Sequence, residues 1–233
     1  MSDHSITSLI EKLEGADKMQ AFSLDDFWSR YGRQEYETTD FAKALERLPS
    51  VAADGPWIAG GAVRRLVTRK AQESDFDFFF KDEVQFDAFC KAVEKAGGFR
   101  TNESDFNITF CIPAVKAKPL GDYEFSLGGP ELKVQAIRID YFESLNAVLE
   151  SFDFSICQCG FDGSSLAFGP WTLWDLANNK LVPGKLRYGA SSLRRVIKYT
   201  RQGFTICGGG LANMLEQVAA DPSIIRGEVE YVD

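Results

Sequence analysis

The spacing of apolar and polar residues predicts alternating strands and helices along most of the chain. An apolar run at Trp57–Ala59 leads into two glycines and a helical run, and the alternation from Asp75 has the period of two that is typical of a strand. A helix is predicted over 83–96, and residues 99–140 have the composition of two to four antiparallel strands. This order of elements predicts an α+β fold in which helices flank a mixed sheet.

Helical periodicity also marks both ends of the chain. In the first fifty residues, Ser23 and Asp26 have the spacing of an N-terminal capping box. A strand is predicted over 154–161, with a turn at Asp162–Gly163. We therefore divide the chain into three parts: a helical N-terminal segment over 1–50, a head over 51–170 and a helical C-terminal segment over 171–233.

The helix predicted over 191–202 combines an apolar side with a basic side. Four residues at helical spacing are predicted to form its buried side: Leu193, Val196, Ile197 and Thr200. The remaining surface carries Arg194, Lys198 and Arg201, within a stretch (176–215) that contains no acidic residue. This basic stripe is either an ordinary solvated face or a place where phosphates bind.

Composition narrows the possible chemistry. The chain has 233 residues, and its 45% hydrophobic and 26% charged residues are ordinary for a globular protein. It has no apolar run of about 20 residues and no basic-then-apolar start, so we expect a cytoplasmic protein without a membrane partner. Five scattered cysteines and a single histidine argue against a zinc site or histidine-based catalysis. Carboxylates are left to carry any chemistry.

Two carboxylates and a pair of glycines supply that candidate chemistry. Asp75 and Asp77 are two apart on a predicted strand, so both leave the same face and can share Mg²⁺ or Mn²⁺. An isolated Asp-x-Asp pair is more often just solvated. Gly60 and Gly61 precede a helix, where bare N–H groups can approach phosphate, and Arg64 on its first turn would face the same phosphates. Together these residues predict a site for a metal ion and phosphate groups.

The same segments resemble the head of the class II transfer-RNA CCA-adding enzyme and bacterial poly(A) polymerase family. Gly60–Arg64 matches the Gly-Gly-x-Val-Arg motif of that family, and Asp75–Asp77 matches its metal-binding Asp-x-Asp. Phe152–Ile156 resembles its Arg-Arg-Asp-Phe-Thr-Ile segment, and Ser192–Arg195 running to Gly203–Ile206 resembles the helix that leads into Gly-Phe-Thr-Ile. The matches follow the order of the family from about residue 56 to 206.

The resemblance implies a polymerase-beta-like nucleotidyltransferase head. Such a head transfers a nucleoside monophosphate from a nucleoside triphosphate to a hydroxyl, here an RNA 3′ end like that of transfer RNA. It implies Asp75 and Asp77 as catalytic residues and ligands of Mg²⁺ or Mn²⁺. The residues that it implies at the nucleotide are Gly60, Gly61, Arg64, Asp153 and Arg194.

The chain also departs from the family pattern. Arg65 stands where the family has an aspartate, and Lys133 or Gln135 stands where a third acidic residue is expected. The alternatives for that acid are Glu131, Asp140 and Asp153, or none. No base-reading motif follows Ile206, so the nucleotide and the acceptor stay open. The alternative functions are nucleotidyl transfer to a protein or small molecule, and an inactive nucleotide-binding or interaction module. The acceptor could also be held by a protein partner or by a second copy of the chain.

Overall fold

A computed structural model describes residues 17–31, 39–116 and 128–225. The start of the predicted N-terminal helical segment, residues 1–16, lies outside the described residues. The described chain forms two compact units. The sheet unit comprises residues 21–31, 39–116, 128–148 and 159–167, and the helical unit comprises residues 17–20, 149–158 and 168–225.

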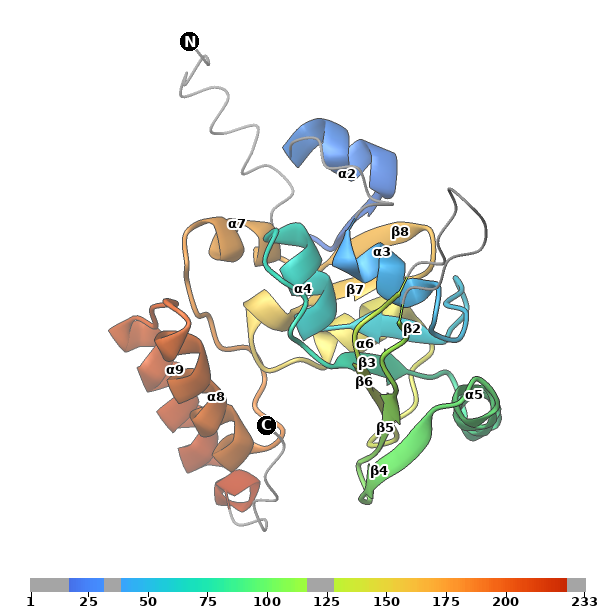
Figure 1. The fold of residues 1–233 in the computed structure, drawn as a ribbon. Helices are drawn as coiled ribbons and strands as arrows, with labels where there is room; N and C mark the ends of the chain where they lie inside the picture. Colours follow the sequence, from blue (N-terminus) through green and yellow to red (C-terminus); the bar gives the residue numbers. More distant parts are fainter. Residues whose placement is uncertain (1–16, 32–38, 117–127, 226–233) are drawn as a thin grey trace. The chain divides into compact units, whose positions relative to one another are not determined.

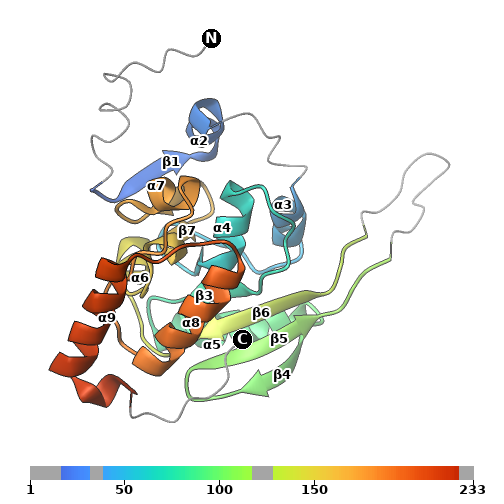
Figure 2. The same ribbon diagram turned by 90° about the vertical axis from the view of Figure 1, so that its left-hand side faces the viewer.

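An eight-stranded mixed sheet has the strand order β1-β8-β7-β2-β3-β6-β5-β4 (Figure 1). The strands are β1 (Gln20–Ser23), β2 (Trp57–Ala59), β3 (Phe76–Phe79), β4 (Phe99–Glu103), β5 (Asn107–Ile112), β6 (Leu132–Ile137), β7 (Cys159–Phe161) and β8 (Ser165–Phe168). β3 runs parallel to β6, whereas β2 is antiparallel to β3 and to β7. Figure 2 shows β4, β5 and β6 as neighbouring strands at one edge. The predicted α+β fold with a mixed sheet is confirmed.

Both units contain helices. They are α2 (Leu24–Tyr31), α3 (Asp40–Leu45), α4 (Gly61–Val67), α5 (Glu83–Lys95), α6 (Leu145–Glu150), α7 (Thr172–Ala177), α8 (Gly189–Arg201) and α9 (Gly208–Ala220), with two 3-10 turns, η2 (Ser155–Cys157) and η3 (Pro222–Ile225). The predicted helix over 83–96 is confirmed: the Asp82 carboxylate caps its start by accepting from the Gln85 N–H at 2.8 Å, and Gly97 follows its end at φ 92°. No helix within the described residues is long and apolar enough to cross a membrane.

The central strands of the sheet have one apolar and one polar face, because successive side chains alternate between faces. Phe76 and Phe78 of β3 pair with Val134 and Ala136 of β6 on the apolar face, where the Phe78 ring lies 4.4 Å from that of Phe89 on α5. The other face carries Asp77 and Phe79 of β3, Lys133 and Gln135 of β6, Asn107 and Thr109 of β5, and Asp75, which directly precedes β3. The strand pattern thus gathers polar side chains on one face of a buried sheet.

The helical unit has a core of its own. Its buried residues come from η2, α8, α9 and the intervening loops: Phe154, Ile156, Cys157, Leu181, Leu186, Tyr199, Phe204 and Met214. α8 and α9 lie side by side in both views (Figures 1 and 2).

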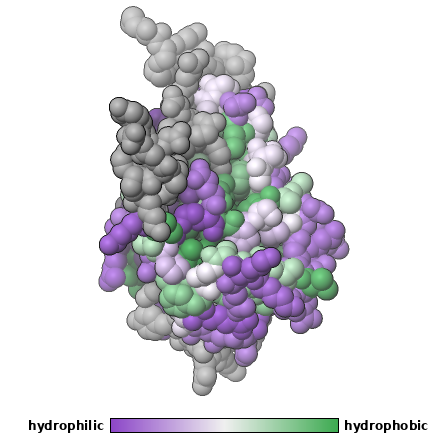
Figure 3. All heavy atoms as spheres, turned by 45° about the vertical axis from the view of Figure 1, so that its right-hand side comes forward, coloured by the Kyte–Doolittle hydropathy of each residue, from purple (hydrophilic) through white to green (hydrophobic). Residues whose placement is uncertain are grey.

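On the surface, hydrophilic residues alternate with smaller hydrophobic groups on the face shown in Figure 3.

Three predictions about the elements were wrong. Residues Gln20–Ser23 form an edge strand beside β8 rather than part of a helical segment. The predicted strand over 154–161 is a 3-10 turn followed by the short strand β7. The Cys157 N–H donates to the carbonyl oxygen of Phe154 at 3.0 Å within the turn, and Thr172 Oγ1 donates to the carbonyl oxygen of Ser155 at 2.9 Å, so these groups do not join a strand ladder.

The third error concerns the buried side of α8. Leu193 and Ile197 are 46% and 54% exposed, whereas Ser192 and Tyr199 are buried. The helix turns its polar Ser192 inward because a buried carboxylate, Asp153, accepts from that hydroxyl at 2.6 Å. Arg194, Lys198 and Arg201 are exposed, as the predicted basic stripe requires.

Candidate functional site

The pairing of β2 with β3 brings the glycine pair to the Asp-x-Asp segment. Ala59 pairs with Asp77 in the antiparallel ladder, so Gly60 and Gly61, which follow Ala59, run back alongside Asp75. A Cβ atom on Gly61 would lie 2.1 Å from the Ser74 hydroxyl oxygen, which shows how close the two segments are. Two motifs that are 14 residues apart in the sequence therefore form one site.

Gly60 turns the chain from β2 into α4. Its backbone has φ 87° and ψ −130°, a conformation that side chains on L residues oppose, and its N–H donates to the carbonyl oxygen of Cys159 at 2.8 Å. Glycine is therefore required here by the backbone itself, whether or not phosphate binds to the turn.

A Gly60→Ala variant is expected to lose about 1–3 kcal/mol of unfolding free energy, because alanine pays the strain of this conformation. Urea denaturation measures the loss. Gly208→Ala is the matched control, since a Cβ atom there meets nothing within 4 Å and the residue starts α9. The control should keep its stability or gain up to about 1 kcal/mol; an equal loss in both variants would show that strain at Gly60 is not the cause.

Asp75 and Asp77 lie on the polar face at the centre of the sheet. Asp77 belongs to β3, between Ala59 of β2 and Gln135 of β6, and Asp75 directly precedes the strand. The Oδ2 atom of Asp75 accepts from Gln135 Nε2 at 2.7 Å and lies 2.9 Å from Lys133 Nζ. The two residues that stand at the expected third acidic position therefore both present donors to Asp75.

A chain of buried amides fixes the orientation of Gln135. Asn107 Nδ2 donates to Gln135 Oε1 at 3.0 Å, and Ser104 Oγ donates to Asn107 Oδ1 at 3.3 Å. A carboxylate only accepts hydrogen bonds, so Gln135 must turn its NH₂ group toward Asp75 and its oxygen toward Asn107. Ser104 and Asn107 are not predicted from the sequence, because nothing in their local pattern distinguishes them from ordinary strand-end residues.

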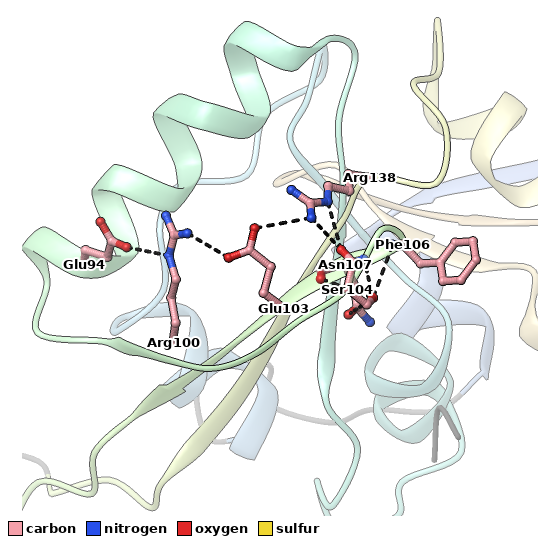
Figure 4. Close-up of polar contacts among 7 residues, drawn as sticks. All are labelled: Glu94, Arg100, Glu103, Ser104, Phe106, Asn107 and Arg138. Atoms are coloured by element: carbon pink, nitrogen blue, oxygen red, sulfur yellow. Dashed lines mark hydrogen bonds and ion pairs between the residues drawn. The ribbon is translucent and has the colours of Figure 1, made fainter. Parts of the chain in front are cut away.

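Ser104 also anchors a network of charged residues at the β4–β5 turn (Figure 4). Arg138 Nε donates to the Ser104 carbonyl oxygen at 3.1 Å, and Arg138 Nη2 lies 3.3 Å from Glu103 Oε1. Arg100 continues the network, with ion pairs to Glu103 at 3.1 Å and to Glu94 at 2.8 Å. Arg138 is thus engaged in holding the turn from which the amide chain to Asp75 starts.

The carboxylate oxygens of Asp75 and Asp77 are ligands that suit a divalent metal ion, which would also bind the substrate. Mg²⁺ is commonly held by one or two carboxylates while water and substrate phosphates fill the other positions, which Asp75 and Asp77 can satisfy. The described residues include no group of three or more His, Cys, Asp or Glu side chains that could hold a metal ion. Glu131 and Asp140 therefore do not complete an all-protein metal site with the Asp75–Asp77 pair in this part of the chain.

Asp153 and Arg194 belong to the helical unit. The buried Asp153 carboxylate accepts from Ser192 Oγ at 2.6 Å and from Arg195 Nη1 at 2.9 Å. Burial lowers the pKa of Arg195, but the Asp153 carboxylate outweighs it, and the pKa of Arg195 lies above its usual value. Asp153 thus ties η2 to α8 through Arg195, the neighbour of the predicted Arg194, and the roles of Asp153 and Arg194 at a nucleotide stay predictions.

A model of the Gabija anti-defense 2 protein family (Gad2) matches residues 18–179. The chain belongs to this family. A Bacillus phage SPbetaL7 protein described as Gabija anti-defense 2 is 24% identical over 174 residues, which cover 73% of this chain and 38% of that protein. This Gad2-family chain therefore spans well under half the length of that relative.

Solved structures of CCA-adding enzymes share the fold of this Gad2-family chain. An apo form has a TM-score of 0.50 at 13% identity, with 89% of this chain and 48% of that chain covered. The Thermotoga maritima CCA-adding enzyme complexed with tRNA has a TM-score of 0.51 at 13% identity, with 86% and 46% covered. The nucleotidyltransferase-like architecture is confirmed, whereas the family is Gabija anti-defense 2 rather than the CCA-adding enzymes.

In this Gad2-family chain, Arg65 ties α4 to the loop before Asp75. Its Nη1 atom donates to the Ala71 carbonyl oxygen at 2.7 Å and lies 3.2 Å from Glu73 Oε2. The loop and α4 line a cleft of about 220 Å³, whose basic residues are Arg65, Arg69 and Lys70. Arg65, which stands where the CCA-adding enzyme family has an aspartate, therefore holds the segment that precedes Asp75.

Asp175 makes the stability of the helical unit depend on pH. Burial raises the pKa of Asp175, and the hydrogen bond from Ser155 Oγ at 2.5 Å opposes that rise. Between the ordinary aspartate pKa of about 4 and the raised value, the native state binds more protons than the unfolded chain, so stability falls as the pH rises through this window.

Asp175→Asn is expected to remove that fall, since the amide oxygen can still accept from Ser155 and no longer titrates. Urea unfolding at a series of pH values between about 4 and 7 measures the slope. Asp87→Asn, at an exposed position of α5, is the control and should keep the slope of the unmodified chain. An unchanged slope in Asp175→Asn would assign the pH dependence to other groups.

Proposed function

We propose that the chain is a metal-dependent nucleotidyltransferase that counters the Gabija defence system. It transfers a nucleoside monophosphate from a nucleoside triphosphate to a hydroxyl acceptor, for which an RNA 3′ end is the first choice. One observation carries the proposal: the glycine turn and the Asp75–Asp77 pair, both expected for this chemistry, meet at one place on the sheet. The link to Gabija rests on the family and on the name of the phage relative.

The residues divide the work as follows. Asp75 and Asp77 would hold Mg²⁺ or Mn²⁺, which when bound neutralises charge on the triphosphate and the leaving pyrophosphate. Gly60 turns the chain so that the N–H of Gly61 at the start of α4, together with the Arg64 guanidinium, receives the triphosphate. The acceptor oxygen bonds to the α-phosphorus, the bond to the bridging oxygen breaks, pyrophosphate leaves and the hydroxyl proton passes to solvent.

Acceptor recognition belongs to the proposal as well. The solved enzymes that share the fold are about twice as long as the matched part of this chain, and one of them is complexed with tRNA. The exposed Arg194, Lys198 and Arg201 on α8 give this chain a basic surface for RNA phosphates. A protein partner or a second copy of the chain would supply further contacts to the acceptor.

The test is transfer of label from each α-labelled ribonucleoside triphosphate, with Mg²⁺ or Mn²⁺, to pooled transfer RNA, other RNA, and protein including the Gabija components. An Asp75→Asn, Asp77→Asn double variant is the control. Label on one acceptor that disappears in the control supports the proposal and identifies the acceptor. Absence of label on every acceptor would reject it.

A second candidate is an inactive nucleotide-binding or interaction module, which the donors on Asp75 favour. Lys133 and Gln135 already occupy one oxygen of a carboxylate that a catalytic metal ion needs. Phage plating on cells that carry Gabija separates the two candidates. If the double variant still protects phage as well as the unmodified chain does, the module is correct.

A further inference from the structure

Lys133 lies directly beside the carboxylate that the proposed metal ion would use. The parallel register pairs Phe76 with Val134, so the preceding residues, Asp75 and Lys133, are neighbours on the polar face. Their side chains form an ion pair of 2.9 Å between Nζ and Oδ2. Asp75 thus has a cationic partner supplied by the chain itself.

The two donors on Asp75 differ in how easily they can move. Gln135 is buried and held by Asn107 through a 3.0 Å hydrogen bond. The Lys133 side chain is 50% exposed, whereas that of Asp75 is 23% exposed. An ammonium group on a flexible, half-exposed stem can leave the carboxylate for water or another anion at little cost, while the amide cannot.

A divalent cation and the Lys133 ammonium therefore compete for the same oxygen atom. A triphosphate changes this competition, because its oxygens complete the coordination of a metal ion and also accept hydrogen bonds from a lysine ammonium. A metal ion that arrives alone must displace Lys133 without compensation, whereas one that arrives with a triphosphate offers Lys133 a new partner.

We propose that Lys133 is a displaceable internal counter-ion that keeps Asp75 neutralised until a divalent metal ion and a triphosphate bind together. In the free chain Lys133 weakens metal binding, and in the complex it contacts the phosphates. The inference rests on the metal site of the proposed function and adds a condition for its occupancy: metal and nucleotide bind with positive coupling.

The test measures Mn²⁺ binding to the nucleotide-free full chain by the electron paramagnetic resonance signal of free Mn²⁺. Lys133→Met is expected to bind Mn²⁺ about tenfold more tightly, because it removes a competing positive charge next to the carboxylate. Lys133→Arg keeps the charge and should bind like the unmodified chain. Lys95→Met removes the same charge from the exposed end of α5 and should change the affinity by less than about twofold.

The second measurement has the opposite sign. Binding of a non-hydrolysable ATP or GTP analogue in the presence of Mn²⁺ should weaken in Lys133→Met by about tenfold, since a phosphate contact is lost. Substitution of a residue that merely stabilised the sheet would not strengthen the binding of Mn²⁺ and weaken the binding of the analogue. Circular dichroism and urea unfolding of each variant establish that the compared proteins are folded.

Equal Mn²⁺ affinities in Lys133→Met and Lys95→Met would overturn the counter-ion, and so would Mn²⁺ binding to the unmodified chain that no addition of analogue strengthens. The labelled-transfer assay keeps this failure separate from that of the proposed function. If the unmodified chain transfers label while Lys133→Met and Lys95→Met bind Mn²⁺ equally well, only the counter-ion is rejected. If Lys133→Met binds Mn²⁺ more tightly but the unmodified chain transfers no label, the transferase is rejected and the counter-ion is supported.

Discussion

Asp77→Asn is expected to lower the rate of nucleotidyl transfer by about a thousandfold or more while leaving the fold intact. The substitution keeps the shape of the side chain and removes the charge that would hold a metal ion, whose contribution is several kcal/mol. Each 1.36 kcal/mol corresponds to roughly a tenfold change in rate, so a loss of about 4 kcal/mol gives this magnitude. Asp77 is only partly buried, and the unfolding free energy should therefore change by less than about 1 kcal/mol.

Initial rates at saturating nucleotide measure the effect on the acceptor that the labelling experiment identifies. Asp105→Asn is the matched control, because it makes the same change at an exposed position of the β4–β5 turn and should keep the full rate. If Asp77→Asn retained more than about a tenth of the rate, Asp77 would not be a ligand of the catalytic metal ion.

The parts of the site that could be predicted from the sequence depend on local rules. The glycine turn and the alternation around Asp77 each follow from a few neighbouring residues. Short strands with clear alternation then place Asp75 and Asp77 on one face whatever the rest of the chain does. The pairing of β2 with β3 that joins the two motifs was not predicted, because the order of the elements indicates only a mixed sheet flanked by helices.

The parts that could not be predicted depend on contacts between distant residues. Gln135 is 60 positions from Asp75 and 28 positions from Asn107, so no local pattern indicates that these amides meet the carboxylate. The same reason explains the error on α8. Asp153 lies 39 positions from Ser192, and the need of one buried carboxylate for a hydroxyl partner outweighed the preference of Leu193 and Ile197 for the core.

Phe78→Ala is expected to lower the unfolding free energy of the sheet unit by about 3–5 kcal/mol. Phe78 is 0% exposed, and its ring lies 4.4 Å from that of Phe89 where β3 meets α5. The substitution removes buried apolar surface and leaves a cavity in a densely packed layer. Urea denaturation that follows the sheet unit measures the loss. Phe99→Ala, at a position of β4 that is 52% exposed, is the matched control and should cost less than about 1 kcal/mol.

Phe78 and Asp77 are adjacent on β3 but point to opposite faces of the sheet. Their variants should therefore have opposite phenotypes: Phe78→Ala lowers stability and keeps the transfer rate per folded molecule within about tenfold, whereas Asp77→Asn keeps stability and loses the rate. Rates measured at low temperature, where Phe78→Ala remains folded, make the comparison direct. If Phe78→Ala lost the rate as completely as Asp77→Asn while still folded, packing on the apolar face would control the geometry of the carboxylates, and the two faces of the strand could not be treated as separate in function.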